Sequence, residues 1–128
     1  MRADCHMHTY FSGDSEAKPE DMVLAAIDKG LEAICFTDHE DIDYFCDDIE
    51  FVFNPETYFK ELGALKEKYK EKLDIRIGVE FGLQPHLAKK AKAFTAAYPY
   101  DFVIGSMHVV GGKDPYYPEF FEGISDEE

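Results

Sequence analysis

Several features that would place this sequence in a class at once are missing from it. Its 128 residues include no tryptophan and no run of about 18 apolar residues, the length that a membrane-spanning helix needs. The first residues lack the apolar segment of a signal peptide, so we expect a cytoplasmic location and no membrane partner. The composition, 45% hydrophobic and 15% aromatic, is that of a globular protein, and the length favours one domain over residues 1–128.

Cysteine pairs are also missing. The chain has three cysteines, Cys5, Cys35 and Cys46, and no two of them form a CxxC motif. An odd number at wide spacing disfavours a disulfide framework, and reduced thiols in a packed interior fit better.

Positive charge is scarce. Thirteen Lys and Arg residues stand against 27 Asp and Glu residues, which gives a net charge of −14. Such a field repels nucleic acid and anionic membranes, so nucleic acid is not expected as a partner. It also repels phosphate esters, and a protein that acts on them would need local positive charge, which bound metal ions supply. The acidic runs 40–43, 47–50 and 126–128 are predicted to be solvated.

Short apolar runs alternate with helical stretches along the chain. The pattern predicts strands over residues 2–8, 33–37, 75–80 and 102–106 and helices over 19–29, 55–72 and 85–98. Pro19 and Pro55 fit the first helical turns, and Gly30 fits a C-terminal cap. The order βαβαβαβ, with connections long enough for parallel pairing, predicts an α/β fold.

Residues that bind metals stand at the ends of these predicted strands. The histidines are His6 and His8, His39 and His108, and Glu80 ends the remaining strand. The carboxyl ends of parallel strands meet at one edge of a sheet, where sites assemble. His6 and His8 are two residues apart, so on a strand both rings point to the same side and can reach one ion.

Each of these motifs has an ordinary structural alternative. An HxH pair is compatible with two surface histidines, Glu80 with an exposed loop position and His108 with a core histidine. Asp38, beside His39, fits either a backbone-bonded turn or a carboxylate that receives the second ring nitrogen of a ligand histidine.

Three further residues are assigned by position. Strand alternation turns Cys5 away from His6 and His8, so we expect it in the core. Asp14 taken alone is a turn aspartate, and His86 follows Pro85 at a helix start and is predicted not to bind metal.

A set of imidazoles and carboxylates without thiolates suits Zn, Mn, Fe or Ni, not a cysteine-type structural zinc.

Taken in order, these motifs resemble the PHP (polymerase and histidinol phosphatase) family, and most closely its histidinol phosphatases. The resemblance lies in His6–Ser15, Phe36–His39, Gly78–Gly82 with Gln84–His86, and Asp101–His108, and it extends over essentially the whole chain. It implies the N-terminal half of a distorted (β/α)7 barrel with up to three metal ions at the carboxyl ends of the strands.

The resemblance also implies roles for individual residues. His6 and His8 would bind one metal, Glu80 would bridge it to a second metal, and His108 would bind that second metal. The ligands of the third metal would be Asp14 and His39, and Asp38 would support the centre from outside the ligand set. The residues expected to serve catalysis are His6, His8, Glu80, His108 and Asp38.

The implied activity is the metal-dependent hydrolysis of a phosphate monoester, with histidinol phosphate of histidine biosynthesis as the expected substrate. Acidic residues such as Glu40, Asp41 or Asp43 would favour its cationic amine, although the solvated alternative is preferred for them. Family members are about twice as long and carry further ligands, so we expect a partner, a swapped homo-oligomer or a truncated form. The alternatives are another PHP phosphoesterase, a non-catalytic metal-binding fragment and a structural half-barrel that works only in a complex.

Overall fold

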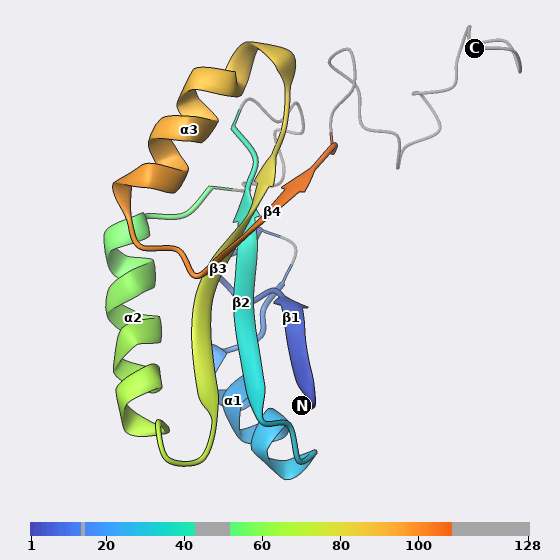
Figure 1. Cartoon of the computed structure of the whole chain (residues 1–128), viewed down its shortest axis with the longest axis vertical. Coiled ribbons are helices and arrows are strands. Elements are labelled where there is room, and N and C mark those ends of the chain that lie inside the picture. The colour runs from blue at the N-terminus through green and yellow to red at the C-terminus, as the bar shows by residue number, and fades with distance from the viewer. Residues whose placement is uncertain (14, 43–51, 109–128) are drawn as a thin grey trace, which may run out of the picture.

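Four parallel strands form one sheet in their order along the chain (Figure 1). The structure is a computed structural model and describes residues 1–13, 15–42 and 52–108. Its elements are β1 (Ala3–Met7), α1 (Pro19–Asp28), β2 (Ala33–Glu40), α2 (Pro55–Lys68), β3 (Asp74–Gly82), the 3-10 helix η1 (Pro85–Leu87), α3 (Ala88–Ala97) and β4 (Phe102–Ser106). Helices between parallel strands confirm the predicted partial (β/α) barrel.

Local geometry confirms the predicted caps at Asn54–Pro55 and Gly30, whereas α2 ends at Lys68, four residues before the predicted end. The side chain of Asn54 accepts a hydrogen bond from the Thr57 backbone N–H at 3.2 Å, and Pro55 opens α2. Gly30 follows α1 with φ = 75°, a conformation that costs glycine little and other residues more. The expected third helix begins with one 3-10 turn before α3.

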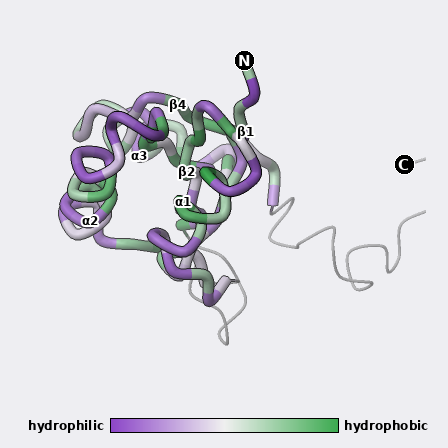
Figure 2. The backbone as a smooth tube through the Cα atoms, turned by 90° about the horizontal axis from the view of Figure 1, so that it is seen from below, coloured by the Kyte–Doolittle hydropathy of each residue, from purple (hydrophilic) through white to green (hydrophobic). Residues whose placement is uncertain are grey.

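The core lies between the sheet and the first two helices. Its cluster of buried residues comes from α1, β2, α2 and β3 and includes Val23, Phe36, Tyr58, Leu62 and Ile75. In Figure 2 hydrophobic and hydrophilic stretches alternate along α2, as expected for a helix with one buried stripe. One face of the two central strands therefore carries apolar side chains toward α1 and α2.

The central strand β2 is longer than its apolar run. It pairs with β3 in continuous register from Ala33 with Asp74 to Glu40 with Phe81, and every residue of β2 is buried. The register sets His39 directly beside Glu80. Because strand residues alternate between faces, these two side chains lie on the side opposite the apolar positions.

The outer strands are more exposed than the central ones. Four of the five residues of β1 are exposed, including Cys5, so the prediction that Cys5 packs in the core is wrong. The reason is that β1 is an edge strand, and its register with β2 shifts between Asp4 and Met7. At the other edge Phe102 and Val103 are 46% and 43% exposed. In the described parts of the chain, no helix has the length and apolarity to cross a membrane.

Candidate metal centre

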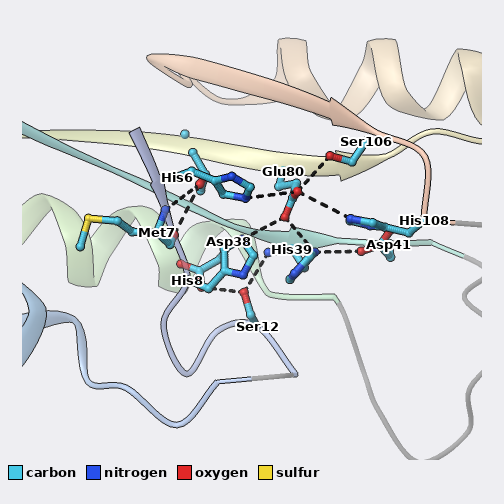
Figure 3. A network of polar contacts seen from close by, with 12 residues as sticks. His6, Met7, His8, Ser12, Asp38, His39, Asp41, Glu80, Ser106 and His108 are labelled. Atoms are coloured by element: carbon cyan, nitrogen blue, oxygen red, sulfur yellow. Dashed lines mark hydrogen bonds and ion pairs between the residues drawn. The ribbon is translucent and has the colours of Figure 1, made fainter. Parts of the chain in front are cut away.

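All four strands bring a polar side chain to the same end of the sheet (Figure 3). His6 lies near the end of β1 and His8 just beyond it, His39 near the end of β2, Glu80 near the end of β3, and His108 just beyond β4. The five side chains, expected from the sequence to meet at the carboxyl ends of parallel strands, are brought together there.

Glu80 occupies the middle of this group. Its Oε1 lies 3.3 Å from His6 Nε2 and 3.6 Å from His108 Nε2, and its Oε2 lies 2.9 Å from His8 Nε2 and 3.1 Å from His39 Nδ1. Ser106 Oγ donates a hydrogen bond to Oε1 at 2.9 Å. One buried carboxylate thus faces nitrogen atoms from four histidines.

A second carboxylate joins the group from the segment after β2. Asp41 Oδ1 lies 2.7 Å from His108 Nδ1, and Asp41 Oδ2 lies 3.2 Å from His39 Nδ1. The side chain of Asp41 is only 4% exposed. Two sets of three residues therefore have ligand atoms close enough to hold an ion: His6, His8 and Glu80, and His39, Asp41 and His108.

The electrostatics favour charged carboxylates in this site. Burial alone would raise the pKa of Glu80, but the adjacent rings of His108 and His8 outweigh it and hold the pKa far below the ordinary range. The pKa of Asp41 is lowered in the same way: burial opposes the shift, and His108 and His39 outweigh it. In return, the hydrogen bond with Asp41 and the adjacent carboxylate of Glu80 raise the pKa of His108 to about 10.

Asp38 ties the loop after β1 to β2. Its carboxylate is fully buried and accepts hydrogen bonds from the Thr9 backbone N–H, from Thr9 Oγ1 at 3.0 Å and from Ser12 Oγ at 2.7 Å. Ser12 Oγ in turn accepts a hydrogen bond from the His39 backbone N–H at 2.9 Å. Burial raises the pKa of Asp38, and these hydrogen bonds and the nearby His8 oppose the rise. Asp38 thus holds together the segments that carry His8 and His39.

The acids after His39 were predicted to be solvated, and for Glu40 and Asp41 this is wrong. They are 6% and 5% exposed, because β2 continues through Glu40 against β3. Glu40 Oε2 accepts a hydrogen bond from the Phe53 backbone N–H at 3.0 Å, and burial raises its pKa to about 7. Asp43 lies outside the described residues.

Two residues singled out in the sequence, Asp14 and His86, are not among the described residues brought together at the strand ends. Asp14, expected to bind a third metal with His39, lies outside the described residues. His86 is exposed in η1 and is a member of neither group of described residues that could hold an ion. Asp41 was not among the predicted ligands, although His39 and Asp41 share the two-residue spacing of His6 and His8 and would point to one side of an extended segment.

The donor set fits divalent metal ions. Two ligands on a tetrahedral zinc ion, at bond lengths near 2.0–2.2 Å, are separated by roughly 3.4 Å. The distances of 3.3 Å and 3.6 Å from Glu80 Oε1 to His6 Nε2 and His108 Nε2 are of this size. Imidazoles and carboxylates are ligands of zinc and of other first-row metals, so both groups of residues offer donors that suit such ions.

Fold and site together define part of a (β/α) barrel that carries two groups of residues able to hold metal ions. Comparison with known proteins gives the family: the family model of the PHP domain matches residues 4–128, and the chain belongs to this family. The predicted resemblance is thereby confirmed.

The relatives of the chain are histidinol phosphatases. It is 38% identical to a histidinol-phosphatase of Lactococcus lactis over 115 residues, which are 90% of this chain and 42% of that protein. It is 32% identical to a probable histidinol-phosphatase of Deinococcus radiodurans, with 91% of this chain and 46% of that protein covered. The chain thus spans less than half the length of these curated relatives.

A solved structure shares the fold of this chain over the matched part. The histidinol phosphate phosphatase of Lactococcus lactis, in complex with zinc, L-histidinol and phosphate, superposes with a TM-score of 0.82 at 38% identity. The match covers 88% of this chain and 42% of that one. Four strands and their helices therefore have the arrangement of part of a complete zinc-binding phosphatase.

Proposed function

We propose that this chain forms the N-terminal part of a metal-dependent phosphate monoester hydrolase of the histidinol-phosphatase type, acting in the cytoplasm. The observation that carries the proposal is the position of Glu80, whose two oxygens face nitrogen atoms of four histidines at 2.9–3.6 Å. The relative from Lactococcus lactis, with zinc, histidinol and phosphate bound, supports the choice of substrate class.

Specific residues would hold the ions. His6 and His8 would bind one ion with Glu80, and Glu80 and His108 would bind a second. Asp14 and His39 are proposed for a third. Zinc, or alternatively Mn, Fe or Ni, would supply positive charge for the phosphoryl oxygens and activate water as the nucleophile.

The protein's own contribution is to hold the donors in place before an ion arrives. Glu80 is buried and kept ionised, and the hydrogen bond from Ser106 fixes one of its oxygens. The side chain of His6 is 56% exposed, whereas the side chain of His39 is only 10% exposed. The solvent side of the site is therefore at His6, where a phosphate ester can approach.

We also propose that further strands complete the sheet, from a partner, a second copy or additional chain. The support is the exposed edge β1 together with the apolar exposure of Phe102 and Val103 beside the other edge. Light scattering after size exclusion tests assembly: a mass near 14.7 kDa would contradict self-assembly of this chain.

The proposed activity is tested by metal content and turnover together. The purified chain is loaded with zinc or manganese, its metal content is measured by elemental analysis, and the release of phosphate from L-histidinol phosphate is followed. Glu80→Gln should lose both metal and turnover, and Glu71→Gln, at an exposed turn, serves as the matched control.

Each outcome separates the alternatives. Turnover of other phosphate esters in preference to histidinol phosphate would indicate another PHP phosphoesterase. Bound metal without turnover of any ester would indicate a metal-binding fragment, and turnover only after assembly would indicate a half-barrel that depends on a partner. A chain that binds no metal would overturn the proposal.

A further inference from the structure

Asp41 contacts two histidines of the site through its two oxygens. Oδ1 is 2.7 Å from His108 Nδ1, and Oδ2 is 3.2 Å from His39 Nδ1. Asp41 is 5% exposed as a residue, so its carboxylate meets little water. Its position admits two roles: a ligand of the same ion as these histidines, or a support that orients one of them.

The two nitrogens of His108 distinguish these roles. Nδ1 lies 2.7 Å from Asp41 Oδ1, a normal length for a charge-assisted hydrogen bond and short for two ligands of one tetrahedral ion. Nε2 lies 3.6 Å from Glu80 Oε1, too long for a hydrogen bond and suitable for two ligands of one ion. The ring is therefore turned with Nδ1 to Asp41 and Nε2 to the ion position.

The neighbouring strand leaves room for this arrangement at Gly82. A Cβ atom at Gly82 would lie 1.8 Å from Asp41 Oδ1 and 2.8 Å from its Cγ. A second contact holds the residue after Asp41: Gln84 Nε2 donates a hydrogen bond to the Ile42 carbonyl oxygen at 3.1 Å. Gly82 and Gln84 of the β3 side thus fix where the Asp41 carboxylate can lie.

We propose that Asp41 is a positioning residue, which accepts the Nδ1–H of His108 and so directs His108 Nε2 toward the ion shared with Glu80. Carboxylates that receive the second ring nitrogen of a metal ligand fix its tautomer and orientation. The inference rests on the proposed function, because it assumes that His108 binds metal. It assigns to Asp41 the supporting role that the sequence suggested for Asp38.

The decisive experiment reads the tautomer of His108 directly. Long-range ¹H–¹⁵N NMR spectra of the full chain, ¹⁵N-labelled on histidine and saturated with zinc, distinguish a protonated from a metal-bound ring nitrogen. His108→Gln assigns the signals. We expect Nδ1 protonated and Nε2 bound to zinc, and a zinc-bound Nδ1 would overturn the inference in favour of Asp41 as a ligand.

Variants supply a second readout in zinc titrations by calorimetry. Asp41→Ala should lower the affinity for the zinc ion at His108 by about 10–100-fold and leave a mixture of the two His108 tautomers. The affinity of Asp41→Asn should fall between those of Asp41→Ala and wild type. Gly82→Ala, which displaces Asp41 without removing it, should have a similar effect. Asp28→Asn, at an exposed helix end, is the matched control and should bind zinc as wild type does.

The outcomes separate the two proposals. If the wild-type chain takes up no zinc, the proposed function fails and this inference with it. If zinc binds normally to folded Asp41→Ala, judged by circular dichroism, only the role of Asp41 is refuted.

Discussion

Replacing Asp38 should separate the hydrogen-bonding role of its side chain from its charge. Asp38→Ala removes the acceptor for the Thr9 N–H, Thr9 Oγ1 and Ser12 Oγ. In Asp38→Asn the amide oxygen can keep the bonds that Oδ1 accepts from Thr9 N–H and Ser12. Its NH₂ group can then donate to Thr9 Oγ1, which sits 3.0 Å from Oδ2.

The expected magnitude follows from burial. Thr9 is fully buried and Ser12 is 1% exposed, so water does not replace the lost acceptor. Each buried donor left without a partner costs about 1–3 kcal/mol, while the two hydroxyls can partly reorient and the desolvation of a buried carboxylate is relieved. We therefore expect Asp38→Ala to lower the free energy of unfolding by about 2–4 kcal/mol and Asp38→Asn by about 1 kcal/mol.

Urea denaturation of the metal-free chain at pH 7 measures both values, and Asp28→Ala, at an exposed aspartate, is the control. Zinc affinity gives a second measurement, since the loop that Asp38 holds carries His8. The reasoning is refuted if Asp38→Ala unfolds within 1 kcal/mol of wild type, or if Asn is as damaging as Ala.

Three further predictions concern the fold and the metal-free site. Leu62→Ala, at a fully buried core position, should cost about 2–5 kcal/mol in denaturant unfolding, and a cost below 1 kcal/mol would contradict the assigned core. Gly30→Ala should cost about 1 kcal/mol from its positive φ alone, because a Cβ there meets no atom within 4 Å; an unchanged midpoint would argue against that conformation. Asp41 raises the pKa of His108 from 6.5 to about 10 in the metal-free fold. The protonated ring therefore stabilises the fold fully below pH 6.5, and this stabilisation is lost as the pH rises through about 10. Unfolding in EDTA across that range should show the loss in wild type and a flatter profile in His108→Gln.

The sequence predicted the order of elements well because its apolar periodicity is strong. Strand and helix positions agree within a few residues wherever an apolar run or a cap marks the end, as at Asn54 and Gly30. The end of β2 was missed because Asp38, His39 and Glu40 are polar, and polar residues in a row do not look like a buried strand. Pairing with β3 overrides that composition, since each of these residues finds a partner among the neighbouring segments.

The errors at single residues have the same origin. Cys5 is exposed because β1 ends the sheet, and strand order cannot be read from alternation along one strand. Glu40 and Asp41 were predicted to be solvated because a run of charged residues usually lies on the surface. Their burial depends on Phe53 and His108, residues 13 and 67 positions away, and such long-range contacts leave no local pattern.

A two-residue period unites the site at all four strand ends. His6 and His8, His39 and Asp41, and Ser106 and His108 each place two polar side chains on one side of an extended segment, as the alternation of strand residues requires. On β3 the same period pairs Glu80 with Gly82, and the missing side chain at Gly82 is where the Asp41 carboxylate lies. Glu80 therefore lies at the centre of the site because the strands on both sides of β3 contribute pairs of polar side chains. β3 itself contributes only the Glu80 side chain, and the position of its missing partner at Gly82 is filled by the Asp41 carboxylate.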